Sequence, residues 1–360
     1  MKINFKIILC VILLSCFGVL MIYSSSYIWA EYKFNNPYRF LIYQSIFLII
    51  GLIIMFIVSK INYKLYEKKS NLILFICFLL LVLVLIPGIG QIRNGSRSWF
   101  GIGPFGIQPS EISKLGLVIF TSKYLAKNNN EKRFTKKFIW PILIVIFLFF
   151  GLIMLEPDFG TGMVIVCSLI VLIFITGTKL DIFIKLGIIG LIGIVALILA
   201  APYRLERIVS FLNPWSDPLG SGFQIIQSLY AIGPGGLLGQ GFMSSRQKHF
   251  YLPEPQTDFI FSIITEEFGL MGCIIICSLF AYLFYNSMKV ALKTDDLFSK
   301  YLCFGFSFML IFQTILNLMV VIGMVPVTGV TLPFISYGGS SLLTSFIMIG
   351  IILNISKKVK

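Results

Sequence analysis

The stretch from Tyr251 to Gly269 reads YLPEPQTDFIFSIITEEFG and joins a polar segment to a long apolar run, Phe259 to Phe284. Asp258 lies at the start of that run, in a chain in which charged residues are only 12% of the total. An ionisable residue at the edge of a membrane segment is costly, so it is a candidate for function. The structural alternative is a helix cap, in which Thr257 or Asp258 accepts hydrogen bonds from the first N–H groups of the following helix. This stretch by itself leaves both interpretations open.

The composition of the whole chain assigns the apolar run to a membrane. The 360 residues are 58% hydrophobic with a mean hydropathy of +0.94. Apolar runs of about 20 residues, the length that a helix needs to cross a bilayer, recur from end to end. We therefore expect an all-α polytopic membrane protein with about ten transmembrane helices, forming a single domain over residues 1–360. The formal charge of +14 does not indicate nucleic-acid binding, because the lysines cluster in short loops between apolar runs.

The first apolar run, Ile7 to Tyr23, follows Lys2 and Lys6 and so has the charged start of a signal peptide. No small-residue cleavage site follows it and further spans do, so we expect a retained first helix. The other spans are predicted at residues 39–58, 71–87, 110–126, 138–155, 160–177, 184–201, 259–285, 301–323 and 339–355.

The distribution of Lys and Arg predicts the orientation of these spans. With both termini cytoplasmic, the long loop of about residues 201–258, between helices seven and eight, is extracellular. The inner segments then hold most of the 29 basic residues, namely Lys2, Lys6, Lys60, Lys64, Lys68, Lys69, Lys123, Lys127, Lys132, Arg133, Lys136, Lys137, Lys179, Lys185, Lys289, Lys293, Lys300, Lys357, Lys358 and Lys360.

Residue counts argue against several kinds of site. All seven cysteines lie in apolar runs and none forms a CxxC pair, so neither a disulfide framework nor a zinc site is indicated. His249 is the only histidine, which excludes a histidine-based metal site and a Ser-His triad. We predict no set of protein metal ligands.

The first outer segment carries four polar or aromatic candidates. Arg97 and Trp99 have a simple structural interpretation, in which both anchor the chain at the membrane interface. Glu111 and Lys114 lie three residues apart at the start of a span, hence on one helix face, where they can form an ion pair. For this pair, structural and functional interpretations stay equally open.

The remaining outer segments indicate turns and irregular backbone. In EPDFGTG, residues 156–162, two carboxylates lie between two helices, and Asp158 is predicted to cap the helix that opens at Gly160. The segment Met324 to Ser341 contains two prolines and a Gly-Gly pair, and irregular backbone at membrane depth is tolerated only where it is buried or lines a cavity. In the long loop, Phe223 to Ile232 is predicted to form an amphipathic helix in the membrane interface. We expect these segments to converge on a polar cavity.

Two functions suit such a cavity. Transport is one, since charges and broken helices suit a substrate pathway, but most of the charge lies at the outer face and the two halves show no symmetry. The other is an enzyme acting on a lipid-linked substrate, in which a carboxylate near an apolar wall serves as general base. An anionic leaving group such as pyrophosphate would then be held by Arg97, Lys114, Arg246 and Lys248.

The chain resembles the SEDS family (shape, elongation, division, sporulation), which contains RodA, FtsW and SpoVE. The resemblance runs nearly end to end, and the sequences of two of its motifs are more similar to FtsW and SpoVE than to RodA. The motifs are NGSRSWF at 94–100, QPSEISK at 108–114, EPDFGTG at 156–162, FLNPWSDPLGSGFQIIQSLYAIGPGGLLGQG at 211–241, SRQKHFYLPEPQTDFIFSIITEEFG at 245–269 and PVTGVTLPFISYGGSS at 326–341.

The resemblance implies a peptidoglycan glycosyltransferase that polymerises lipid II at the outer face of the cytoplasmic membrane, with inversion at the sugar, for cell division or sporulation. It places the essential aspartate of the family at Asp258, as general base, and the tryptophan of the first outer loop at Trp99. It places polar cavity positions at Arg97, Glu111 and Lys114. Arginine or lysine residues, with or without a divalent cation such as Mg or Mn, would offset the charge of the departing pyrophosphate.

The resemblance also implies partners. The substrates are lipid II and the growing lipid-linked strand, and crosslinking is expected from a class B penicillin-binding protein, because the chain has no transpeptidase motif. A lipid II flippase is the alternative function, and a scaffold for the wall-building complex is a third. The residues leave open the role in division, sporulation or elongation, the oligomeric state, the need for a partner and the stem-peptide chemistry of the substrate.

Overall fold

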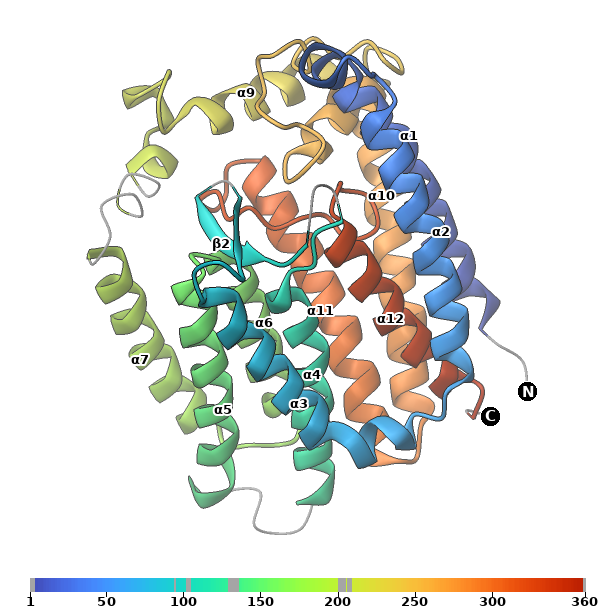
Figure 1. The fold of residues 1–360 in the computed structure, drawn as a ribbon, viewed down its shortest axis with the longest axis vertical. Coiled ribbons are helices and arrows are strands. Elements are labelled where there is room, and N and C mark those ends of the chain that lie inside the picture. The colour runs from blue at the N-terminus through green and yellow to red at the C-terminus, as the bar shows by residue number, and fades with distance from the viewer. Residues whose placement is uncertain are drawn as a thin grey trace.

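The computed structural model describes residues 4–93, 95–101, 105–128, 136–199, 205 and 209–358, which form a bundle of long helices (Figure 1). Outside these residues lie Asn94, residues 102–104, the basic residues Lys132, Arg133 and Lys360, and residues 200–204 and 206–208 at the start of the long loop. The helices are α1 (Phe5–Phe34), α2 (Arg39–Lys60), α3 (Lys64–Leu85), α4 (Pro109–Lys127), α5 (Lys136–Leu155), α6 (Phe159–Phe174), α7 (Leu180–Leu199), α9 (Phe223–Ile232), α10 (Ile260–Lys293), α11 (Leu297–Val321) and α12 (Gly339–Ser356), with short 3-10 turns at Pro214–Ser216 and Gly233–Gly235. Strands β1 (Gln91–Arg93) and β2 (Ser96–Trp99) form an antiparallel hairpin.

Each predicted span overlaps a long helix of the described chain. Among the described residues, seven helices are long and apolar enough to cross a membrane, judged by length and composition, and α6 is apolar but shorter, with 16 residues. The all-α membrane fold is therefore confirmed, while the number of ten spans stays a prediction. The predicted amphipathic helix in the long loop is present as α9.

Two helices differ from their predicted ranges. The first, α1, has 30 residues and continues past Tyr23 to Phe34, where Asn35 ends it in the left-handed conformation at φ 52°. At 1.5 Å per residue this helix is about 45 Å long, more than a bilayer core of about 30 Å. The second, α10, has 34 residues but is interrupted at Gly269, where φ is 61° and ψ is −161°. The sequence interpretation missed this break.

Close packing of α2 against α12 depends on glycine. A Cβ on Gly51 of α2 would collide with the ring of Phe346 on α12, and a Cβ on Gly350 of α12 would lie 2.8 Å from the Met55 carbonyl oxygen. Because lipid tails are as apolar as leucine, helices in a membrane associate through such close contact rather than through a hydrophobic driving force.

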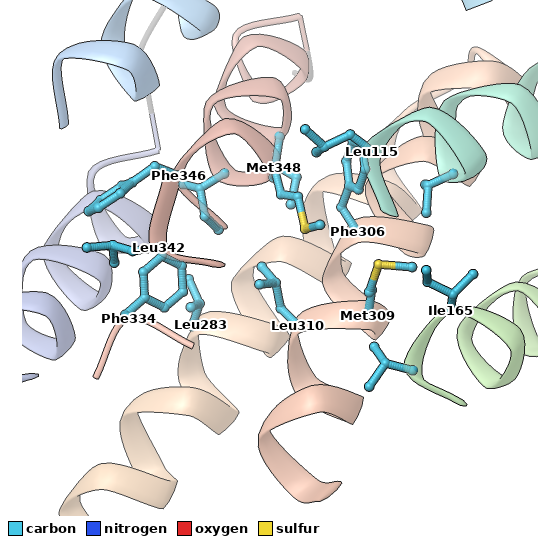
Figure 2. Close-up of a cluster of buried hydrophobic side chains, with 14 of the residues drawn as sticks. Leu115, Ile165, Leu283, Phe306, Met309, Leu310, Phe334, Leu342, Phe346 and Met348 are labelled. Carbon is cyan, nitrogen blue, oxygen red and sulfur yellow. The ribbon is translucent and has the colours of Figure 1, made fainter. Parts of the chain in front are cut away.

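A buried apolar cluster lies among α4, α6, α10, α11 and α12 (Figure 2). It also contains Phe334, from the segment that precedes α12. This cluster holds together the helices whose polar side chains are described below. Its labelled members are Leu115, Ile165, Leu283, Phe306, Met309, Leu310, Phe334, Leu342, Phe346 and Met348.

The segment between α11 and α12, residues 322–338, forms neither helix nor strand, as its prolines and glycines predicted. Buried side chains bind several of its carbonyl groups. Asn317 donates to the carbonyl oxygen of Val330 at 2.8 Å, and Gln313 donates to that of Thr331 at 2.9 Å. Such pairing meets the requirement that buried backbone groups find partners inside a membrane protein.

Candidate active site

Asp258 lies at the end of the long loop, two residues before α10 begins at Ile260. The N-cap residue of α10 is Phe259, whose side chain makes no capping hydrogen bond, so neither Thr257 nor Asp258 occupies the N-cap position of this helix. The half-buried Asp258 carboxylate instead accepts a hydrogen bond from the Thr257 hydroxyl, with 3.0 Å between the oxygens. The functional interpretation of this carboxylate therefore stays a prediction.

The backbone around Asp258 is held by α11 and by residues 322–338. The buried amide of Asn317 donates to the Asp258 carbonyl oxygen at 2.7 Å and to the Val330 carbonyl oxygen at 2.8 Å. The N–H of Tyr337 donates to the Gln256 carbonyl oxygen at 2.8 Å. Two segments that are distant in sequence thus fix the main chain on which Asp258 lies.

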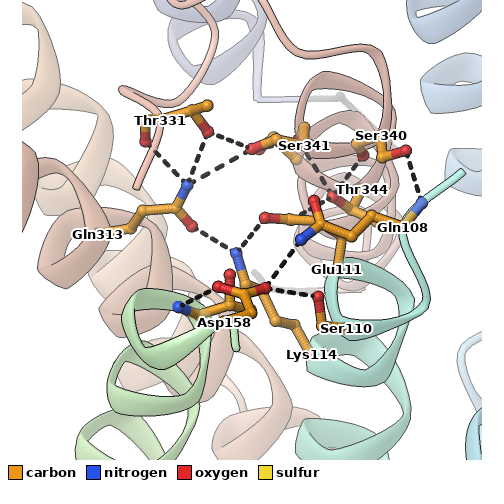
Figure 3. A network of polar contacts seen from close by, with 12 residues as sticks. Gln108, Ser110, Glu111, Lys114, Asp158, Gln313, Thr331, Ser340, Ser341 and Thr344 are labelled. Atoms are coloured by element: carbon orange, nitrogen blue, oxygen red, sulfur yellow. Dashed lines mark hydrogen bonds and ion pairs between the residues drawn. The ribbon is translucent and has the colours of Figure 1, made fainter. Parts of the chain in front are cut away.

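Glu111 and Lys114 form the predicted ion pair, inside the bundle (Figure 3). The ammonium of Lys114 lies 2.7 Å from Glu111 Oε1 and 2.8 Å from Gln313 Oε1, and Glu111 Oε2 accepts from Thr344 at 3.2 Å. Only 1% of Lys114 and 5% of Glu111 is exposed. A buried pair that is bonded in this way avoids the cost of an uncompensated charge.

The polar face of α11 links this ion pair to Asp258. Gln313 and Asn317 are four residues apart, so they lie on one face of the helix. Gln313 contacts both the Lys114 ammonium and the Thr331 carbonyl oxygen, while Asn317 contacts Val330 and Asp258. One helix face therefore joins two of the regions that the sequence assigned to a common site.

Asp158 caps α6 as predicted. Its Oδ1 accepts from the N–H of Thr161 at 3.2 Å. Its Oδ2 accepts from the Gln108 amide at 2.8 Å and from the Ser110 hydroxyl at 2.9 Å (Figure 3). The aspartate thus ties the start of α6 to the start of α4, which places it in a structural role.

Glu156, in the turn between α5 and α6, has a different environment. The residue is fully buried, and neither carboxyl oxygen has a hydrogen-bond partner within the described chain. Burial, reinforced by the neighbouring charge of Asp158, raises the pKa of Glu156 to about 9. The group is therefore neutral at pH 7.

The β1–β2 hairpin places Arg97 and Trp99. Arg97 Nη1 donates to the Leu85 carbonyl oxygen at the end of α3, at 3.5 Å. The half-buried Trp99 has the guanidinium of Arg93 5.0 Å from its ring centre. The Ser96 hydroxyl donates to the carbonyl oxygen of Glu156, which attaches the hairpin to the α5–α6 turn.

Arg246 and Lys248, which the sequence assigned to one anion-binding cavity, have different environments. Arg246 is exposed, and its backbone N–H donates to Glu266 Oε1 at 2.7 Å. Lys248 is buried, with its ammonium 2.9 Å from Glu267 Oε1 and 3.3 Å from the Ser24 hydroxyl. In this conformation Lys248 faces a carboxylate rather than an open cavity. Two adjacent glutamates in an apolar run were the available sequence signal for such a partner.

Two further arginines lie near the Asp258 segment and were missed. Burial raises the pKa of Tyr337 to about 12, and the charges of Arg39 and Arg93 act in the opposite direction. The guanidinium of Arg39 lies 4.0 Å from the ring centre of Phe34. Arg39 directly precedes Phe40, whose ring packs against that of Tyr337 with 4.9 Å between the ring centres.

The chain belongs to the FtsW/RodA/SpoVE family, described as cell cycle protein, which it matches over residues 4–360. The stage V sporulation protein E of Bacillus subtilis (strain 168) is 50% identical over 352 residues, which cover 98% of this chain and 96% of that protein. The probable peptidoglycan glycosyltransferase FtsW of Geobacter sp. (strain M18) is 38% identical over 355 residues, covering 98% and 96% of the two chains. The family inferred from the motifs is confirmed.

Solved structures have the same fold. One is a chain from a structure described as "Structural coordination of polymerization and crosslinking by a peptidoglycan synthase complex". It has a TM-score of 0.81 and 29% identity, and the match covers 99% of this chain and 98% of that one. The rod shape determining protein RodA of Thermus thermophilus has a TM-score of 0.72 and 27% identity, covering 100% and 98%. The similarity extends over essentially the whole of each chain.

Proposed function

We propose that this protein is a peptidoglycan glycosyltransferase that polymerises lipid II into glycan strands, with Asp258 as the general base. The observation that supports this most directly is the position of Asp258: its backbone is fixed by Asn317 just before α10 begins, and its half-buried carboxylate lies beside the Thr257 hydroxyl. The relatives named as probable peptidoglycan glycosyltransferases and the synthase-complex structure support the same activity.

The reaction requires one base. The 4-hydroxyl of the acceptor sugar attacks the anomeric carbon of the lipid-linked strand from the face opposite the pyrophosphate. Asp258 accepts the hydroxyl proton as the new C–O bond forms, and the electron pair of the old C–O bond leaves with the lipid pyrophosphate. Attack and departure on opposite faces invert the configuration and need no covalent intermediate. The carboxylate must approach that hydroxyl within hydrogen-bond distance, directly or through one water.

Arginine side chains are the best candidates for holding the pyrophosphate. Lys114 and Lys248 are each paired with a buried glutamate, so their charges are already compensated. Arg39 precedes Phe40, which packs on Tyr337 beside the Asp258 segment, and Arg93 and Arg97 belong to one hairpin. Guanidinium groups suit phosphate oxygens because their planar donors can bind two oxygens at once.

The described residues offer few candidate ligands for a divalent cation. Within the described residues, no group of three or more His, Cys, Asp or Glu side chains could hold a metal ion. We therefore assign no step to Mg²⁺ or Mn²⁺.

The proposed active site faces outside. Lys60 ends α2, Lys127 ends α4 and Lys293 ends α10, and these three ends lie together, opposite the end that carries the long loop (Figure 1). Lysine-rich ends are cytoplasmic by the positive-inside rule. The similar structure described for polymerization and crosslinking by a peptidoglycan synthase complex supports a crosslinking partner, which we expect to be a class B penicillin-binding protein.

A lipid II flippase is the second candidate. The buried Glu111–Lys114 pair favours it, because ionisable residues inside a bundle mark substrate pathways in transporters. An assay in liposomes that contain lipid II and the protein with its class B partner distinguishes the two functions. Glycan ladders that persist with penicillin support the polymerase. Movement of lipid II across the bilayer with no ladder under any pairing supports the flippase.

A further inference from the structure

The break in α10 divides it into a short half-helix, residues 260–268, and a longer one, residues 270–293, on either side of Gly269. Breaking a helix leaves the last carbonyls of one half and the first N–H groups of the other without helical partners. In a buried position, these groups need partners from elsewhere.

The long outer loop supplies them. Residues 236–241, which we call the plug, bind the backbone on both sides of the break. The four hydrogen bonds run from Gln240 N to Glu266 O at 2.9 Å, from Gly241 N to Glu267 O at 3.0 Å, from Leu270 N to Gly236 O at 2.9 Å and from Met271 N to Leu237 O at 3.1 Å.

The plug can approach this closely because of its glycines. A Cβ on Gly239 would collide with the Glu267 carbonyl oxygen, and a Cβ on Gly269 would collide with the backbone of Leu237. Both glycines also have positive φ, 81° and 61°, which other residues rarely adopt. The close fit of this loop into the helix break thus explains why its sequence is rich in glycine.

A second set of contacts ties the loop to the same half-helix through side chains. Glu266 accepts from the Ser245 hydroxyl at 2.5 Å and from the Arg246 N–H at 2.7 Å. Glu267 binds the Lys248 ammonium at 2.9 Å, and both side chains of this ion pair are 0% exposed. The Ser24 hydroxyl donates to Glu267 at 2.7 Å, which adds α1 to the cluster.

The short half-helix is therefore held at its C-terminal end by the outer loop, while Asp258 lies two residues before its N-terminal end. With nine residues at 1.5 Å each it is about 13 Å long, so a shift at its C-terminal end is passed along its hydrogen-bonded backbone to the Asp258 end. We propose that Lys248 and Glu267 are positioning residues. Their buried ion pair, together with the plug, fixes the position of the short half-helix and thereby the position of Asp258 at its other end. This inference rests on the proposed role of Asp258 as general base.

A positioning role predicts a loss of rate rather than of substrate binding. In the full chain with its class B partner, we expect Lys248→Met to lower kcat for lipid II polymerisation roughly 10- to 100-fold, because small misplacement of a reacting group has effects of that order. We expect KM to change less than about twofold, since no substrate contact is removed. Lys248→Arg, which keeps the charge, should recover most of the rate. Amide hydrogen exchange over residues 260–268 should rise in Lys248→Met and not in Lys248→Arg.

The matched control is Lys185→Met, which removes the surface pair Lys185–Asp181, 3.9 Å apart and exposed on both sides. Its kcat should equal that of the native protein. If Lys248→Met does not fold, as judged by gel filtration and an apparent Tm, Glu267→Gln replaces it, because the amide keeps the shape and a polar contact to Ser24 while losing the charge.

The outcomes separate this proposal from the function on which it rests. A folded Lys248→Met or Glu267→Gln protein with native kcat and native exchange overturns the positioning role, while an inactive Asp258→Asn protein leaves the general base in place. A large rise in KM with unchanged kcat also overturns it, because Lys248 would then bind substrate directly. Activity of Asp258→Asn defeats the proposed function itself.

Discussion

The side-chain amide of Asn317 lies 2.7 Å from the carbonyl oxygen of Asp258 and is fully buried between α11 and the end of the outer loop. The same amide nitrogen lies 2.8 Å from the Val330 carbonyl oxygen. One side chain thus holds two irregular segments, and the first of them carries the proposed catalytic carboxylate. This contact makes α11 a support of the site, although none of its residues was a predicted site residue.

Asn317→Leu should therefore lose activity as well as stability. Two buried carbonyl groups lose their donor, which costs on the order of 1–3 kcal/mol each. The displaced Asp258 should lower kcat roughly 10-fold or more. Asn286→Leu is the control, because that buried amide donates only within its own helix, to the Tyr282 carbonyl oxygen. Equal kcat in the two variants would show that Asn317 does not position Asp258.

The Glu111–Lys114 pair should show strong coupling. Lys114→Met leaves a buried carboxylate without its cation and should cost about 3–5 kcal/mol of stability, whereas replacing both residues by apolar ones should cost less than the two single changes together. The exposed Lys185–Asp181 pair should contribute no more than about 0.5 kcal/mol in the same double-mutant cycle. Additive losses at the buried pair would contradict this account.

Glu156→Gln should raise stability in a pH-dependent way. Because the pKa of Glu156 rises from 4.5 to about 9 on folding, the unfolded chain ionises first as pH increases, and native stability falls between these values. The neutral amide does not ionise, so its advantage over the native protein in unfolding free energy should grow from pH 5 to pH 8 by at most about 1.4 kcal/mol per pH unit, seen as a growing difference in apparent Tm. A Tm difference that is constant with pH would show that this carboxyl is not buried in its neutral form.

Gly239→Ala should disrupt the plug. The added Cβ meets the Glu267 carbonyl oxygen, and the residue has a φ of 81°, so both the loop and the half-helix have to shift. We expect loss of polymerisation and a lower apparent Tm. Gly151→Ala on α5 is the control, because a Cβ there meets no atom within 4 Å, and alanine stabilises a helix over glycine by roughly 0.5–1 kcal/mol. Native activity in Gly239→Ala would contradict the role of the plug.

Features that depend on neighbouring residues were predictable from the sequence. The apolar runs located the helices, the three-residue spacing of Glu111 and Lys114 predicted their ion pair, and the position of Asp158 before Gly160 predicted its cap. Each of these follows from helix periodicity or from the free N–H groups of one helix end. Local rules therefore described the bundle well.

Features that depend on distant partners were not predictable. The Lys248–Glu267 pair spans a loop, the Asn317–Asp258 contact joins α11 to the end of the outer loop, and the backbone groups freed at Gly269 are bound by the distant plug. Of the two interpretations left open for Asp258, the cap does not match the N-cap position, which belongs to Phe259 because α10 starts at Ile260. One glycine in an apolar run does not indicate which backbone will pack against it.

The most direct test of the central claim compares native protein with Asp258→Asn, each purified with its class B partner and supplied with lipid II. Products are separated on a gel, with and without penicillin, after gel filtration has shown that both proteins fold and bind the partner. The account predicts glycan ladders from the native protein in both conditions and none from Asp258→Asn. Ladders of native length and rate from Asp258→Asn would contradict the assignment of Asp258 as the general base.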